Sequence, residues 1–255
     1  MSKFVDKLQS LSKSSTTPIG FHPSVSELKG PKMLLIVELS GAQVKEAKMV
    51  ADINVDAGLI LSEGSSAKVV KQMVEAAGDV PLGVFVKGTD EKEINELTGV
   101  GCDFVVFDIR IPAAVLHKEG VGKLLMIEPS LDQGFVRAIN NLEVDGVFIS
   151  SRSGDSFVAV EHLLVYRRFV ELLEKPVMVV LPSLVTKSEL ASLWQAGVDG
   201  VVAPPTQSLE TLTELKKVIG DLPRGARGRR VKAGVVLPHY GGGVTEEKDE
   251  EQEEI

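Results

Sequence analysis

The feature that most constrains this chain is a short motif, an aspartate followed by a run of apolar residues. It occurs four times, at residues 55–62, 102–108, 144–150 and 198–203. Apolar runs of a second kind, each entered by Pro, Gly or Lys, lie at residues 33–39, 81–87, 123–128 and 176–181. The two kinds alternate along the chain, so the sequence contains eight strand-sized apolar runs with a period of two.

This pattern predicts one closed barrel of the (β/α)8 type. Each run is continuously apolar, as expected for parallel strands that are buried on both faces. Helix-like segments separate the runs, and 255 residues is a usual length for one such barrel. An open, doubly wound sheet is the alternative, but it does not require a paired motif that repeats four times.

The chain divides into three parts. Residues 1–32 are an N-terminal helix and linker, in which Phe4, Leu8 and Leu11 have helical spacing. Residues 33–222 form the barrel, and residues 223–255 are a tail that is first basic and then acidic, which predicts disorder. The N-terminal helix could plug the bottom of the barrel or pack on a partner subunit, and the sequence leaves both open.

The net charge, the cysteine count and the lengths of the apolar runs argue against several classes of protein. A formal net charge of −8 argues against nucleic-acid binding, because that needs Lys and Arg to neutralise phosphates. A single cysteine, Cys102, permits no internal disulfide, which is typical of a reducing compartment. We find no signal peptide and no apolar run near the roughly 20 residues of a membrane span, so we expect a cytoplasmic protein.

The tail gives a first testable expectation. A chain that ends at Pro223 should keep nearly the same melting temperature as the full chain, because the tail offers few apolar residues to bury. Thermal unfolding followed by circular dichroism measures this. A loss of more than a few degrees would instead show that the apolar segment at residues 235–237 is docked.

Charged residues at the ends of the apolar runs mark a candidate site. In (β/α)8 barrels the active site lies at the C-terminal ends of the strands. Glu38, Lys87, Asp108 and Glu128 each end an apolar run, where an unpaired charge would be costly. The apolar residues 124–127 before Glu128 predict that its carboxylate has limited hydration. Further candidates on these ends and loops are Arg110, Ser150, Arg152 and Asp155. Alternation along the strands predicts that Asp108 and Arg110 share one face, as do Ser150 and Arg152.

Other common sites are not predicted. Many barrels bind phosphate through Gly-rich loops after strands seven and eight. Here the loops contain Pro182, Pro204 and Pro205, which lack the backbone N–H donors that such a cradle uses. The sequence also contains no zinc motif, no nucleotide-binding loop and no nucleophile elbow.

Two blocks resemble known barrel enzymes. Ile127-Glu128-Pro129, followed by residues 144–149, resembles the metal-dependent pyruvate aldolases of the hydroxyheptenedioate aldolase type. That resemblance implies Glu128 as a metal ligand and an Asp after strand six, where Asp155 lies two residues late. Lys87 stands where that family tends to have an Arg. The same blocks, with Lys87 and Glu128, are also similar to indole-glycerol-phosphate synthase barrels.

These observations lead to a lyase hypothesis with an aldolase-like activity on a small anionic metabolite. The catalytic candidates are Glu128, Lys87 and Asp108, and the substrate-binding candidates are Arg110, Glu38, Ser150 and Arg152. Glu128 and Asp155 are the candidate ligands of Mg²⁺ or Mn²⁺. The alternative is a catalytically silent barrel that serves as a binding or assembly module. Whether the chain forms a homo-oligomer is left open.

Overall fold

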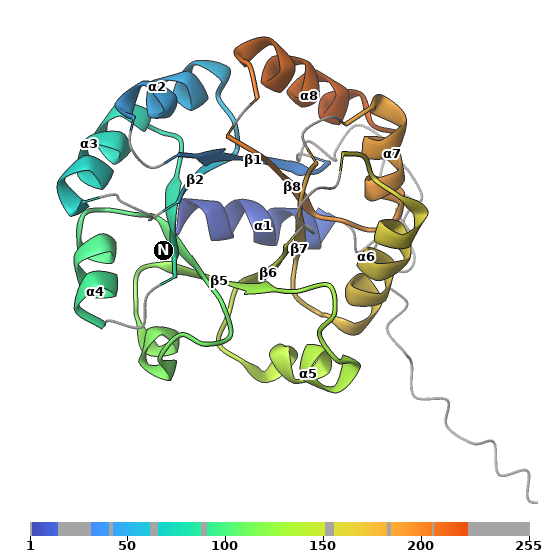
Figure 1. The fold of residues 1–255 in the computed structure, drawn as a ribbon, viewed down its shortest axis with the longest axis horizontal. Helices are drawn as coiled ribbons and strands as arrows, with labels where there is room; N and C mark the ends of the chain where they lie inside the picture. The colour runs from blue at the N-terminus through green and yellow to red at the C-terminus, as the bar shows by residue number, and fades with distance from the viewer. Residues whose placement is uncertain are drawn as a thin grey trace, which may run out of the picture.

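Eight parallel strands close into a barrel in the computed structural model, which describes residues 2–14, 32–40, 43–61, 66–87, 91–150, 156–182, 185–205 and 207–223 (Figure 1). Each strand pairs with the next in sequence, and β8 pairs with β1. The strands are β1 Leu34–Leu39, β2 Ala57–Leu61, β3 Leu82–Val86, β4 Phe104–Phe107, β5 Gly122–Ile127, β6 Gly146–Ile149, β7 Val177–Val180 and β8 Gly200–Ala203. The predicted barrel is therefore confirmed, and the open sheet is excluded.

Helices surround the barrel, with one additional helix across it (Figure 1). The α-helices are α1 Lys3–Ser14, α2 Val44–Ile53, α3 Ala67–Ala77, α4 Glu91–Gly99, α5 Gln133–Ala138, α6 Val160–Leu172, α7 Lys187–Gln195 and α8 Leu209–Asp221. The segment between β4 and β5 contains only a five-residue 3₁₀ helix, η1 Ala113–His117, and a second one, η2 Ile139–Asn141, extends α5. Within the described ranges, no helix has the length and apolar character needed to cross a membrane.

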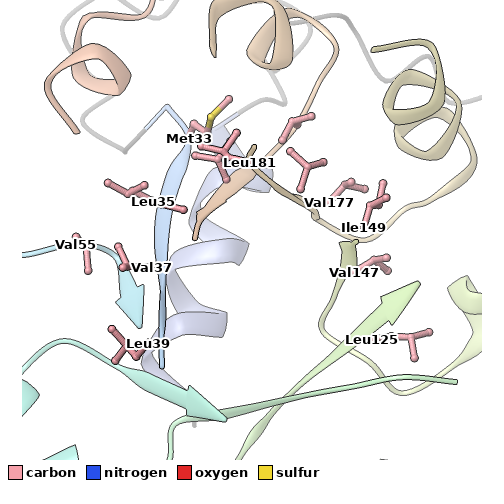
Figure 2. Close-up of a cluster of buried hydrophobic side chains, with 14 of the residues drawn as sticks. Met33, Leu35, Val37, Leu39, Val55, Leu125, Val147, Ile149, Val177 and Leu181 are labelled. Carbon is pink, nitrogen blue, oxygen red and sulfur yellow. The ribbon is translucent and has the colours of Figure 1, made fainter. Parts of the chain in front are cut away.

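The hydrophobic core has two layers that follow the alternation of each strand. Outward-facing residues of the strands, such as Leu35 and Val37, pack against the surrounding helices (Figure 2). Inward-facing residues, such as Leu34 and Ile36, fill the barrel together with residues of α1. Both layers are apolar because each strand is covered on its two faces, which explains the continuous apolar runs in the sequence.

The repeated aspartate has a structural role at the N-terminal end of the barrel. Asp56, Asp145 and Asp199 each precede an even-numbered strand, and each carboxylate accepts the amide N–H of a residue at the start of the preceding strand. The N···O distances are 2.8 or 2.9 Å. The donors are Leu35, Lys123 and Val177. One carboxylate thus joins two strands, so the motif repeats with every second strand.

Asp103, the fourth copy, binds helix α1 instead. Its carboxylate accepts hydrogen bonds from the Ser2 hydroxyl at 2.6 Å, the Lys3 amide at 2.7 Å and the Phe4 amide at 2.9 Å. A carboxylate at this end of a helix satisfies amides that have no partner within the helix, and it favours the helix dipole. Asp103 thereby fixes the N-terminus of α1 beneath strand β4.

Helix α1 plugs the bottom of the barrel, which was one of the two arrangements that the sequence left open. Phe4 is fully buried and its ring stacks on that of Phe104, with centroids 4.6 Å apart. Gly122 leaves the space that α1 occupies, because a Cβ atom there would lie 2.7 Å from Cγ2 of Val5 and 2.9 Å from Oγ of Ser2. The linker at residues 15–31 and the tail from residue 224 lie outside the described residues.

Candidate functional site

Glu38 is the most unusual charged residue at the C-terminal mouth of the barrel. Its strand alternates so that Leu34 and Ile36 face the barrel interior, and Glu38 continues this face toward the mouth. The side chain is partly buried, and desolvation by burial raises the pKa of Glu38 to about 7. Near neutral pH this carboxyl group therefore exists in both protonation states, as a group that moves protons requires.

Lys87 contributes a positive charge to the same mouth. It follows β3, where Phe85 belongs to the inner layer of the core, and the Lys87 ammonium lies 5.7 Å from the centre of the Phe85 ring. Such a distance permits a cation–π contact, which holds the flexible side chain above the interior. Lys87 is exposed, so its ammonium group remains accessible to an anion at the mouth.

Asp108 and Arg110 are arranged differently from the prediction. The alternation argument requires the strand to continue through residue 110, but β4 ends at Phe107, and residues 109 and 110 lie in a turn. The Asp108 carboxylate accepts the backbone amide of Arg110 at 2.7 Å. Strand alternation therefore does not set the direction of Arg110, and the reason given for placing both side chains on one face was wrong.

Glu128 stands at the end of β5 on a loop with several internal restraints. The Ser130 hydroxyl donates to Oε2 of Glu128 at 3.3 Å, and the Leu131 amide donates to its backbone carbonyl. From α6, Arg168 donates to the carbonyl of Pro129 at 2.9 Å. Glu128 is exposed rather than desolvated, so the expectation of limited hydration at this carboxylate was wrong.

Ser150 connects two strands in the structure. Its hydroxyl donates to the carbonyl of Ile127 at 3.3 Å, and its amide donates to the same oxygen at 3.0 Å. This dual contact fastens the end of β6 to the end of β5. Ser150 thus helps to position Glu128, which directly follows Ile127.

Arg152 and Asp155 lie outside the described residues, in the segment 151–155 that follows β6. The structure therefore does not test their proposed roles in substrate and metal binding. In the part of the chain that is described, no group of three or more His, Cys, Asp or Glu side chains could hold a metal ion. The metal site at Glu128 and Asp155 remains a prediction.

A cavity of about 310 Å³ lies beside β7 and β8, away from these charged residues. Leu181, Pro182 and Pro204 contribute to its wall at the strand ends, and Lys187 and Glu214 span its edge with an ion pair of 3.7 Å. Two of the prolines that argue against a phosphate cradle thus line it. We regard the charged mouth as the better candidate site, because none of the predicted site residues lines this cavity.

Glu38 was predicted to bind substrate, together with Arg110, Ser150 and Arg152. Its raised pKa was not predicted. The available signal was its position: Glu38 is flanked by apolar residues on both sides, since Val37 precedes it and Leu39 follows it. Only the closed barrel shows that this carboxyl is more desolvated than that of Glu128.

Fold and site together define a (β/α)8 barrel with charged groups at its C-terminal mouth. A solved structure of an Aquifex aeolicus VF5 protein is similar over 88% of this chain and all of its own, with a TM-score of 0.61 and 16% identity. A mutant tryptophan synthase α subunit from the hyperthermophile Pyrococcus furiosus is similar over 75% of this chain and 98% of its own, with a TM-score of 0.59 and 16% identity.

These similarities establish the fold and nothing finer. Identities this low carry no residue-level correspondence. No protein-family profile matches the chain, and no curated protein matches it in sequence. The comparisons do not confirm the resemblance to pyruvate aldolases.

Proposed function

We propose that this barrel is an enzyme that acts on a small anionic metabolite at its C-terminal mouth, with aldol-type lyase chemistry. The observation that carries the proposal is the pKa of about 7 for Glu38, a partly buried carboxyl group on the inward face of β1. Perturbed carboxyl groups near a barrel mouth are typical of acid–base catalysis. The similarity in fold to the tryptophan synthase α subunit is compatible with an enzyme.

In this proposal Glu38 transfers the proton of an aldol cleavage. With a 4-hydroxy-2-keto acid, the carboxylate takes the proton of the C4 hydroxyl group, and the C3–C4 bond breaks. The products are an aldehyde and an enolate that holds the electron pair of the broken bond. The carboxyl group then returns the proton to C3 of the enolate, which completes the reaction without a net change in protonation.

Positive side chains would bind the negative charges of this substrate. Lys87 is the described residue best suited to the substrate carboxylate, because its ammonium is exposed at the mouth above Phe85. Arg110 and Arg152 are further proposed contacts. Asp108 and Glu128, both at the C-terminal ends of strands, are proposed to orient the substrate hydroxyl or a water molecule.

Glu128 and Asp155 would be the residues that hold Mg²⁺ or Mn²⁺, and the ion would supply positive charge for the oxygen atoms of the substrate. The described residues do not supply a complete ligand set around Glu128. The proton transfer assigned to Glu38 and the anion binding assigned to Lys87 are argued from these two side chains.

Ligand binding tests the proposal before a substrate is known. Pyruvate, oxaloacetate and 2-oxoglutarate, each with and without Mg²⁺ or Mn²⁺, should be screened by thermal unfolding. A keto acid present at a hundred times its dissociation constant adds about 2.7 kcal/mol. For a chain of this length that raises the melting temperature by roughly 5–10 °C.

Three variants test whether the keto acid that raises the melting temperature binds at the charged mouth. Lys87→Gln and Glu128→Gln should remove most of the shift, because each loses a charge at the mouth. Lys68→Gln, an exposed lysine on α3, should retain the full shift. Release of pyruvate from a 4-hydroxy-2-keto acid, lost in Glu38→Gln, then tests the reaction. If no keto acid changes the melting temperature of the wild type, the proposal is wrong.

The second candidate function is a catalytically silent binding or assembly module. The prolines at the ends of β7 and β8 favour it, because they remove a backbone phosphate cradle that many barrel enzymes use. On this alternative the Lys87→Gln variant would change neither a ligand response nor an activity. Glu128→Gln would then affect only stability.

A further inference from the structure

The cavity beside β7 and β8 lies between helices α7 and α8, which are neighbours in the outer ring of the barrel (Figure 1). Leu181 and Ala203 close it at the ends of the two strands, and both side chains are buried. Its volume of about 310 Å³ is at the lower end of small-molecule pockets, which measure about 300–1,000 Å³. The cavity therefore suits a ligand much smaller than a nucleotide.

The interior of this cavity is apolar. Leu190 of α7 and Leu215 of α8 line it, and both are buried. Thr186 and Thr211 also line it, but hydrogen bonds of 2.6 and 2.9 Å hold their hydroxyl groups in the N-terminal caps of the two helices. An apolar group is therefore the part of a ligand that the interior accommodates.

Two opposite charges stand at the edge of the cavity. The Lys187 ammonium lies 3.7 Å from the Glu214 carboxylate, and these side chains are 74% and 67% exposed. An exposed ion pair of this kind contributes little to stability, so a ligand can replace its contacts at small cost.

This pair of charges selects the polar part of the ligand. A ligand with only a carboxylate meets a like charge at Glu214, and a ligand with only an ammonium group meets one at Lys187. An α-amino acid carries both charges on neighbouring atoms. Its ammonium group can face Glu214 while its carboxylate faces Lys187, so its charges are complementary to those of the pair.

We infer that the cavity between α7 and α8 binds a free α-amino acid with a large apolar side chain, such as leucine, methionine or phenylalanine. Glu214 binds the ammonium group, Lys187 binds the carboxylate, and the apolar side chain enters the interior. Each buried CH₂ group raises the affinity about fourfold, so leucine should bind far more tightly than glycine. The inference goes beyond the proposed function and does not depend on it.

Isothermal titration calorimetry of the full chain tests this binding. Leucine should bind saturably below about 10 mM, and glycine should bind at least about tenfold more weakly. 4-Methylpentanoate is leucine without its ammonium group, and 3-methylbutylamine is leucine without its carboxylate. Each should also bind at least about tenfold more weakly than leucine, because each lacks one charge-assisted contact. The inference is wrong if leucine, methionine and phenylalanine all fail to bind in this range, or if 4-methylpentanoate binds as tightly as leucine.

Two variants test the roles of the charges. Glu214→Gln should weaken leucine binding about tenfold and strengthen the binding of 4-methylpentanoate, because the like charge beside Lys187 is removed. Lys187→Gln should weaken leucine binding equally and strengthen the binding of 3-methylbutylamine. A folding defect cannot improve the binding of one ligand. Lys217→Gln, at an exposed position of α8 that does not line the cavity, should keep every affinity of the wild type. Leucine affinities that are unchanged in both charge variants would overturn the inference.

Discussion

Replacing Phe4 with alanine is expected to lower the free energy of unfolding by about 3–5 kcal/mol, the usual cost of removing a buried Phe side chain. Phe4 is fully buried between α1 and the barrel, and its ring stacks on Phe104. The truncation leaves a cavity at the bottom of the barrel. The strand residues around this cavity, such as Phe104, are themselves packed in the barrel core, so they can close it only in part.

Urea unfolding of the wild type and the variant measures this loss as a lower midpoint. Gln9→Ala is the matched control, since Gln9 lies on the exposed face of the same helix and alanine has a high helix propensity. It should leave the midpoint close to that of the wild type. Equal midpoints for all three proteins would mean that α1 contributes nothing to stability.

Replacing Glu38 with glutamine is expected to stabilise the protein at pH 8 by about 2–3 kcal/mol. Burial raises the pKa of Glu38 from 4.5 to about 7 in the folded chain. Each pKa unit corresponds to about 1.4 kcal/mol, and partial hydration of the side chain reduces the total. Above pH 7 the folded wild type holds a desolvated carboxylate, whereas the unfolded chain holds a hydrated one.

The sign of this effect gives it a distinctive dependence on pH. The neutral form of Glu38 favours the folded state, so its contribution to stability is complete below pH 4.5 and is lost as the pH rises through 7. Glutamine does not titrate. The stability difference between variant and wild type should therefore be small near pH 4 and largest at pH 8.

Unfolding free energies at several pH values between 4 and 8 test this prediction. Glu210→Gln, at an exposed position on α8, should stay within about 0.5 kcal/mol of the wild type at each pH. If Glu38→Gln also loses the proposed activity, stability and function oppose each other at this residue, as is common for functional sites. A stability offset that is constant across this pH range would contradict the raised pKa.

The turn aspartates illustrate what could be predicted about the fold. Their spacing and the apolar runs between them were sufficient to predict the closed barrel. Strands that are apolar on both faces and alternate with helices leave few other arrangements. Asp56, Asp145 and Asp199 then play one repeated role. Asp103 has the same sequence context but caps α1, which depends on a segment about 100 residues away.

The candidate site was also predicted only in part. Glu38, Lys87, Asp108 and Glu128 were recognised as charges at the ends of apolar runs, and the structure places all four at the C-terminal ends of strands. The direction of Arg110 was not predictable, because the exact end of β4 decides whether strand alternation applies. Desolvation was assigned to Glu128, but the structure assigns it to Glu38.

The sequence by itself determined the barrel, its eight strands and the identity of the charged residues at its mouth. These follow from patterns over a few neighbouring residues, since periodicity and burial are local properties of each strand. Only the tertiary structure decided which carboxyl group is desolvated, where α1 docks, and which residues line the cavity between α7 and α8. Each of these depends on atoms that are distant in the chain, because burial and electrostatic environment arise from packing between elements.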